Sequence, residues 1–180
     1  MRKELKEYID KPVTLIGRFD RYGRKKDIHD KCSWNTAFLK DLTFENGKPA
    51  CDHLWFLVQK QFLTTTLKEN AVVKISGVVS LYRRKNNSED LGIKDYIKLE
   101  VLHQGDKLVP SKIWKMGKYT YFKFILDSGT RWYKIKDKQV FRVRFVFEYD
   151  KFIEEPFIIL PRNRESEKLF VEENLMKWLI

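Results

Sequence analysis

The sequence predicts a mainly β protein with two β-rich regions and a C-terminal helix. Apolar and polar residues alternate with a period of two in several short runs, most plainly over residues 95–103 and 139–149, as they do in half-buried strands. Asn46-Gly47 separates two apolar runs, and this dipeptide is a strong hairpin signal. With 43% apolar residues and only 8 Gly and 5 Pro among 180 residues, the composition is typical of a packed chain rather than a disordered one.

The first β region is expected to hold five strands. They are predicted over residues 12–19, 34–44, 51–58, 71–82 and 95–103, with polar loops over 22–31 and 83–95 and a short helix within 59–70. Gly17 and Gly77 interrupt the first and fourth strands, and an interior glycine commonly marks a bulge or a sharp bend. Because Pro49 lacks a backbone donor, the hairpin loop beside it is expected to exceed two residues.

This order of elements resembles the oligonucleotide/oligosaccharide-binding (OB) fold, a five-stranded Greek-key barrel. The residues that carry the resemblance are 13–19 with Gly17, 39–42 and 72–79. It extends over residues 10–103 and points to a fold rather than to one family, so residues 1–103 are interpreted as an OB-type domain. Because OB folds also bind proteins and sugars, the resemblance favours nucleic acid without identifying the ligand.

The remainder of the chain is predicted to be a linker, then a smaller antiparallel β segment with a C-terminal helix. The linker covers residues 104–118 and the second domain covers 119–180. In that domain strands are expected over 119–126, 130–136 and 139–149, an edge strand over 156–161 and a helix over 164–180. Residues 107–147 hold 11 Lys or Arg against two acids, which indicates either a second basic surface or the solvated face of a sheet.

The charge balance favours an acidic partner. Lys and Arg outnumber Asp and Glu by 36 to 25, for a formal net charge of +11 and a pI near 9.5, and binding to a polyanion releases counterions. The charged N-terminus has no apolar run behind it, and no window reaches the ~18 apolar residues of a membrane span. Cys32 and Cys51 alone do not make a disulfide framework. We therefore expect a soluble, cytoplasmic protein with no membrane partner.

The two strands of the first hairpin are expected to carry the binding face, as they do in OB folds. If Leu39 faces the core, Phe38 and Lys40 face outward, and on the partner strand His53 and Trp55 also face outward. A register error of one residue would exchange the inward and outward sets. Flat rings would stack on bases while cations in the flanking loops follow the backbone. The candidate nucleic-acid-binding residues are Arg18, Tyr22, Arg24, Lys25, Lys26, Phe38, Lys40, Trp55, Tyr82, Arg83, Arg84 and Lys85.

Metal binding and catalysis are both argued against by the sequence. His29 and Cys32, with Cys51 and His53, have the residue types and spacing of a zinc site. In the hairpin, however, the two pairs lie at opposite strand ends, about 30 Å apart at ~3.3 Å per residue. No Gly-rich phosphate loop, nucleophile elbow or His-Glu-x-x-His pattern is present. We therefore expect no metal, no cofactor and no catalytic site.

The expected function is non-enzymatic binding of single-stranded nucleic acid, DNA favoured over RNA, accessory to replication, recombination or repair. Dedicated bacterial single-stranded-DNA-binding proteins commonly carry a flexible acidic tail with a hydrophobic tip. Residues 172–180 are instead apolar and helix-like, which favours a specialised binder of the phage or mobile-element type. The alternative is a protein-interaction module that docks a partner through the barrel or the C-terminal helix. Neither reading predicts an oligomeric state.

Overall fold

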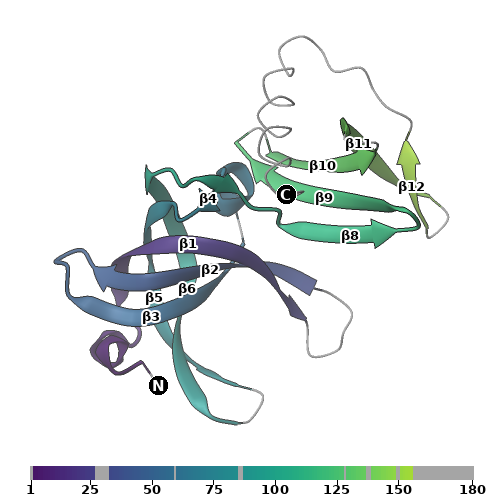
Figure 1. Cartoon of the computed structure of the whole chain (residues 1–180). Coiled ribbons are helices and arrows are strands. Elements are labelled where there is room, and N and C mark those ends of the chain that lie inside the picture. The colour runs from purple at the N-terminus through teal and green to yellow at the C-terminus, as the bar shows by residue number, and fades with distance from the viewer. Residues whose placement is uncertain are drawn as a thin grey trace.

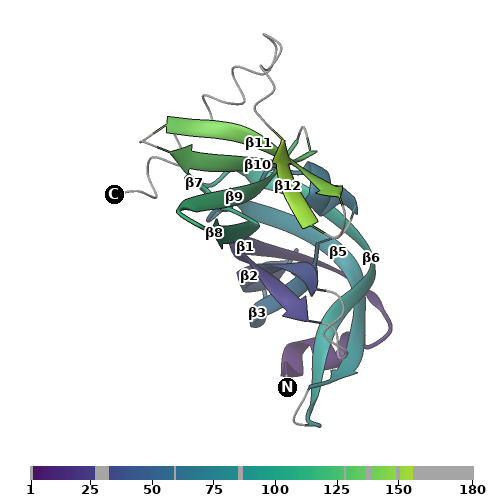
Figure 2. The same ribbon diagram turned by 90° about the vertical axis from the view of Figure 1, so that its right-hand side faces the viewer.

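The computed structural model describes residues 2–26, 33–58, 60–84, 87–127, 129–136, 139–148 and 151–155. Within these residues the protein is mainly β, as predicted, and its strands form two five-stranded antiparallel sheets and one two-stranded ribbon (Figure 1). The N-terminal sheet curls around its own core, and the second sheet lies beyond one end of it (Figures 1 and 2).

The N-terminal sheet has the strand order β3-β2-β1-β5-β6. Its strands are β1 (Pro12–Lys26), β2 (Ser33–Phe44), β3 (Pro49–Leu57), β5 (Val72–Arg83) and β6 (Glu89–His103). The 3-10 helix η1 (Lys3–Tyr8) precedes them, and the 3-10 helix η2 (Lys60–Thr64) and the short strand β4 (Lys68–Glu69) lie between β3 and β5. The five predicted strands are therefore all present in this sheet and in the predicted order along the chain, whereas β4 was not predicted.

The loops predicted over 22–31 and 83–95 are shorter in the structure, because the adjoining strands extend into them. β1 continues through Lys26 and β6 begins at Glu89, so residues 22–26 and 89–95 are strand rather than loop. These residues are mostly polar, but pairing with β2 and β5 provides their backbone hydrogen bonds. Such pairing overrides the weak β-propensity of charged side chains. The two hairpins consequently extend as two-stranded arms that point in different directions (Figure 1).

The bends predicted at the two interior glycines are confirmed. The β1–β2 register shifts at Gly17, and the β5–β6 register shifts at Gly77. A Cβ on Gly17 would lie 3.0 Å from Cγ of Leu42, so the glycine makes room for a fully buried leucine. The hairpin turn at Asn46-Gly47 is longer than two residues, and Gly47 adopts a φ of 81° that favours glycine.

The inward side chains of this sheet form one core together with Leu5 of η1. The inward register predicted for β2 and β3 is confirmed, because Leu39, Leu54 and Phe56 are all buried to within 1% of full burial. The curl of the sheet brings its two edge strands, β3 and β6, into contact. Burial of large side chains at this level is the main stabilising term of such a fold.

Arg2 links the two edge strands of the N-terminal sheet. Its Nε donates to the carbonyl oxygen of His53 on β3 at 3.1 Å, and its Nη1 donates to Oδ2 of Asp90 on β6 at 2.8 Å. The same Nη1 also donates to the carbonyl of Leu91. One side chain therefore satisfies acceptors on both edges, at a position where backbone pairing between β3 and β6 is not observed in the described residues.

The second sheet has the order β12-β11-β10-β9-β8. Its strands are β8 (Lys112–Met116), β9 (Tyr119–Leu126), β10 (Gly129–Lys136), β11 (Gln139–Glu148) and β12 (Lys151–Glu155). The three strands predicted over 119–149 are confirmed, whereas β12 was not predicted. Residues 104–118, which we expected to be a linker, contain β8 and the short strand β7 (Lys107–Leu108). The predicted edge strand over 156–161 and helix over 164–180 lie outside the described residues.

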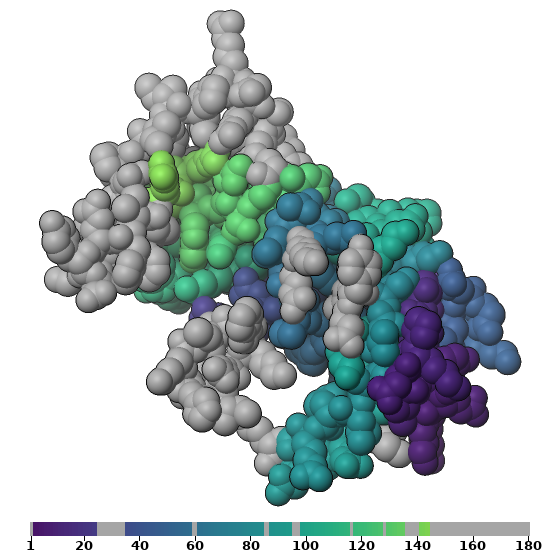
Figure 3. Space-filling view, turned by 180° about the vertical axis from the view of Figure 1, so that it is seen from behind, coloured from purple at the N-terminus to yellow at the C-terminus, as the bar shows by residue number. Residues whose placement is uncertain are grey.

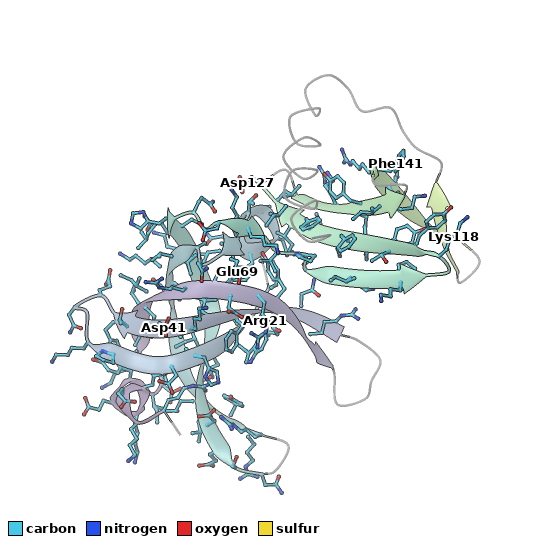
Figure 4. The ribbon with its side chains drawn as sticks, in the orientation of Figure 1. Arg21, Asp41, Glu69, Lys118, Asp127 and Phe141 are labelled. Carbon is cyan, nitrogen blue, oxygen red and sulfur yellow. The ribbon has the colours of Figure 1, made fainter. Side chains whose placement is uncertain are left out.

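The two sheets are joined through η2 and the segment that follows it. Thr66 and Asp127 exchange hydrogen bonds, one from the Thr66 backbone N to Oδ1 at 2.7 Å and one from the Asp127 backbone N to Oγ1 at 2.9 Å. Figure 4 shows Asp127 at the edge of the second sheet that faces η2, and the space-filling view shows the green second sheet adjoining the blue surface around η2 (Figure 3). β4 pairs with β7 beside them, so residues 104–111 follow a bonded path between the sheets.

Gly105 is the tightest point of this connection. A Cβ there would lie 1.8 Å from the carbonyl oxygen of Glu69 and 2.6 Å from the backbone N of Ala71. Because both neighbours are backbone atoms, we expect Gly105→Ala to lower the free energy of unfolding by about 1–3 kcal/mol. Urea denaturation followed by circular dichroism measures the change.

Gly92→Ala is the matched control for this substitution. A Cβ on Gly92 would meet only the ring of Tyr82, at 3.2 Å, and an exposed ring can move aside. We expect the free energy of unfolding of this variant to stay within about 0.5 kcal/mol of the wild type. Equal stability of the two variants would contradict the close backbone approach at Gly105.

Candidate nucleic-acid interface

Four side chains from three strands make a contiguous group on the outer surface of the N-terminal sheet. We call Arg21, Phe38, His53 and Trp55 the β2–β3 cluster. Phe38 and Trp55 are cross-strand partners, and their ring centroids are 4.7 Å apart, while the His53 ring stacks on Phe38 at 5.3 Å. The guanidinium carbon of Arg21 lies 4.5 Å from the Phe38 centroid and 5.7 Å from that of Trp55 (Figure 4). Aromatic and cationic groups therefore meet at one place on this surface.

Trp55 is the member of the cluster best placed to stack on a base. Its side chain is 43% exposed. A Cβ on Gly23 would lie 2.5 Å from the indole atom Cζ3, so the ring lies directly against the backbone of β1. An indole that is held on one side and open on the other offers a flat surface and loses little rotamer freedom on binding.

An extra residue in β1 decides which of its side chains reach this surface. The β1–β2 register shifts between Phe19 and Arg21, which leaves Asp20 without a partner in the ladder. A single extra residue moves every later side chain to the opposite face. Arg21 therefore joins the outer surface, although it was not among the predicted residues. Nothing in the sequence pattern marks this bulge.

The same bulge corrects the prediction for Tyr22, which was expected beside the groove. Tyr22 instead turns into the core and packs against Phe19, with ring centroids 4.8 Å apart. Its hydroxyl is buried without a hydrogen-bond partner among the described residues, and burial raises the pKa of that hydroxyl well above its ordinary value. Tyr22 is therefore half-buried against the core, with its hydroxyl turned away from solvent, and is no longer a candidate for base stacking.

Asp20 holds the cations at the rim of the β2–β3 cluster. Its Oδ1 accepts a hydrogen bond from Nζ of Lys40 at 3.1 Å, and its Oδ2 accepts one from Arg21. Burial acts to raise the pKa of the Asp20 carboxyl, but the hydrogen bonds from Lys40 and Arg21 bring it below its ordinary value. The carboxylate therefore positions both cations in the free protein. A phosphate entering the cluster would compete with it for the same donors.

Of the other predicted cations on β1, the side chains of Arg18 and Arg24 are described, whereas those of Lys25 and Lys26 are not. Arg18 is exposed and pairs in register with Lys40 of β2, and Arg24 is exposed on the β1–β2 arm. Lys25 and Lys26 belong to β1 by their backbone, whereas we had expected them in a loop. Their side chains, and all of Lys85, lie outside the described part of the structure.

Two predicted binding residues on the β5–β6 arm, Tyr82 and Arg84, contact the carboxylate of Asp90. Arg84 donates twice to Oδ2 of Asp90, and the hydroxyl of Tyr82 lies 3.1 Å from the same oxygen, which Arg2 also contacts. The Asp90 side chain is 1% exposed. Burial acts to raise the pKa of this carboxyl, but the Arg84 hydrogen bonds lead the contacts that hold it below its ordinary value. Tyr82 and Arg84 are thus turned toward Asp90 rather than the β2–β3 cluster, while Arg83 is exposed.

Of the four residues considered as zinc ligands, the structure describes only Cys51 and His53. His29 and Cys32 lie outside the described residues. Cys51 is half-buried on β3, and burial raises the pKa of its thiol to about 11, so it is protonated at neutral pH. His53 is part of the β2–β3 cluster. In the described ranges no group of three or more His, Cys, Asp or Glu side chains is arranged to hold a metal ion.

The two helices of the described chain, η1 and η2, are short 3-10 segments. No helix in the described ranges has the length and apolar character needed to cross a membrane. The chain matches no protein-family model, no curated protein and no solved structure.

Proposed function

We propose that this protein binds single-stranded nucleic acid, without catalysis, across the outer surface of β2 and β3. The observation that carries the proposal is the exposed Trp55, held against β1 and flanked by Phe38 and the Arg21 guanidinium. A single strand needs flat rings for its bases and cations for its phosphates, and base stacking contributes about 1–3 kcal/mol per base. The formal net charge of +11 favours the same class of partner.

The strand topology supports an OB-type barrel as the framework of this site. The order β3-β2-β1-β5-β6 is antiparallel throughout. The two edge strands approach each other with Arg2 between them, and a short helix precedes the fourth strand of the sheet. In OB folds the face of the second and third strands binds oligonucleotides, and the position of the β2–β3 cluster on the second and third strands of this sheet supports the proposal.

The proposed binding mode assigns different work to the rings and to the cations. Trp55 stacks on a base, and Phe38 supports it from the neighbouring strand. Arg21 and Lys40 release the Asp20 carboxylate and bind phosphates of the strand's backbone instead, and Arg18 contacts a further phosphate. We favour DNA over RNA, and a role accessory to replication, recombination or repair in the cytoplasm of a cell or of a phage-infected host. The assigned stacking and phosphate contacts are sequence-tolerant, so no base preference is proposed.

Fluorescence anisotropy with labelled single-stranded oligonucleotides at two salt concentrations tests this function. Each phosphate neutralised contributes about −0.7 to the slope of log K against log salt for a single strand. With three or more phosphate contacts, we expect a slope of about −2 or steeper. Undetectable binding at low salt would overturn the proposal. Binding of a partner protein that is nearly independent of salt would favour the alternative, a protein-interaction module.

A further inference from the structure

A second group of cations and rings lies where the β1–β2 arm meets the second sheet. Arg24 comes from β1, Lys112 and Trp114 from β8, Lys123 from β9, and Trp132 from β10. We call these five residues the junction cluster. The arm runs beneath β8 in both ribbon views (Figures 1 and 2). The cluster is therefore built by segments about 90 residues apart in the sequence.

The two lysines and two tryptophans of the cluster share one face of the second sheet. Lys112 and Lys123 are direct cross-strand partners, and Lys123 is also the partner of Trp132. The ammonium of Lys112 lies 5.4 Å from the Trp114 centroid and 5.5 Å from that of Trp132, and the ammonium of Lys123 lies 5.7 Å from Trp132. The two indoles meet edge to face at 6.1 Å. The lysine stems are thus fixed against rings while their charges converge.

The positive charges of this cluster repel one another. Burial lowers the pKa of Lys112, and the charges of Arg24 and Lys123 lower it further. Burial and Arg24 likewise lower the pKa of Lys123. Like charges held in this way raise the free energy of the unliganded protein. An anion placed among them would remove that repulsion, so the cluster is prepared for a negatively charged ligand.

Several cations of the N-terminal sheet, in contrast, form ion pairs with acidic side chains. Lys40 pairs with Asp20, Lys74 with Glu45 and Arg84 with Asp90. None of the three junction cations forms an ion pair with an acidic side chain among the residues that the structure describes. Within the described ranges, this lack of a paired carboxylate distinguishes the junction cluster from an ordinary solvated basic face, where alternating signs are the norm.

We propose that the junction cluster binds the backbone of the same single strand that crosses the β2–β3 cluster, so that the binding surface extends from the N-terminal sheet onto the second sheet. This inference rests on the proposed function. β1 passes through both places, since Arg21 belongs to one and Arg24 to the other, about 10 Å further along the strand. Their side chains leave opposite faces of β1, so the bound strand would cross from the outer face to the second sheet over the edge of β1 that lies beyond its pairing with β5. Lys112, Lys123 and Arg24 contact phosphates, and the indoles of Trp114 and Trp132 offer flat surfaces to bases. An acidic peptide would use the charges but gain less from the indoles.

Two oligothymidylates of different length test the extension. One has about five nucleotides and covers a single site, and the other has about 20 and can reach both, given that one OB fold occupies about 4–16 nucleotides. The test variant is Lys112→Gln with Lys123→Gln. The control is Lys48→Gln with Lys115→Gln, which removes the same charge from two exposed lysines, one at the β2–β3 turn and one on the other face of β8. Anisotropy gives the affinities and circular dichroism checks the fold.

We expect the test variant to bind the long oligonucleotide about tenfold more weakly at low salt, with a salt slope shallower by about 1.4, which is two phosphate contacts. Its affinity for the short oligonucleotide should match that of the control. Lys112→Arg with Lys123→Arg should restore the binding of the long one. This rescue distinguishes loss of charge from loss of packing.

Three results would overturn the extension. The test variant could match the control on the long oligonucleotide, it could weaken both lengths equally, or polyglutamate could compete as well as the oligonucleotide does. In each of these cases the wild type still binds the short oligonucleotide, and the proposed function stands. Failure of the wild type to bind either length would instead overturn the proposed function and this extension with it.

Discussion

Trp55→Ala is expected to weaken the binding of a single-stranded oligonucleotide by about tenfold or more, because stacking of one base contributes about 1–3 kcal/mol. The indole is 43% exposed and touches the protein through Gly23 and Phe38. Few core contacts are lost with it, so the free energy of unfolding should change by less than about 1 kcal/mol. Anisotropy titration measures the first quantity and urea denaturation the second.

Two further variants show whether stacking is the cause. Trp55→Phe keeps a flat ring and should retain most of the affinity. Leu102→Ala removes a 37% exposed apolar side chain from β6 and should leave binding unchanged. If Trp55→Ala bound as tightly as Leu102→Ala, the β2–β3 cluster would not be the site. If Trp55→Ala unfolded the protein, Trp55 would be a core residue.

Phe56→Ala is expected to lower the free energy of unfolding by about 3–5 kcal/mol, the usual range for a buried phenylalanine. Its side chain is 0% exposed and belongs to the core of the N-terminal sheet. Because Phe56 follows Trp55 directly and faces the other way, the two substitutions test the two faces of one strand. Thermal and urea denaturation measure the loss.

Phe56→Leu provides the graded control, since it keeps much of the apolar volume and should cost clearly less than alanine. At temperatures where Phe56→Ala is still folded, we expect its oligonucleotide affinity to stay near that of the wild type. A stable Phe56→Ala variant that loses binding would mean that the faces of β3 are assigned the wrong way round.

Period-two alternation was enough to predict most of the strands and the outward side of the first hairpin. The pattern Leu54, Trp55, Phe56 has only one arrangement that buries two large side chains and leaves the polar neighbours wet, because a strand has two faces. Gly17 and Gly77 likewise indicate the bends in their strands, because an interior glycine weakens a strand and often marks a bulge or a tight bend. Local chemistry is sufficient in these cases, and the structure agrees with it.

The sequence by itself therefore determined the β class, the order of the strands, and the outward placement of Phe38 and Trp55. Tertiary structure alone decided the rest of the surface. The bulge at Asp20 turns Arg21 outward and Tyr22 toward the core. It arises from the register in which β1 pairs with β2, which depends on both strands. The junction cluster arises because the β1–β2 arm passes beneath β8, which places Arg24 beside lysines far along the chain. Period and propensity act between neighbours in sequence, whereas register and inter-sheet contacts depend on distant partners that no local pattern contains.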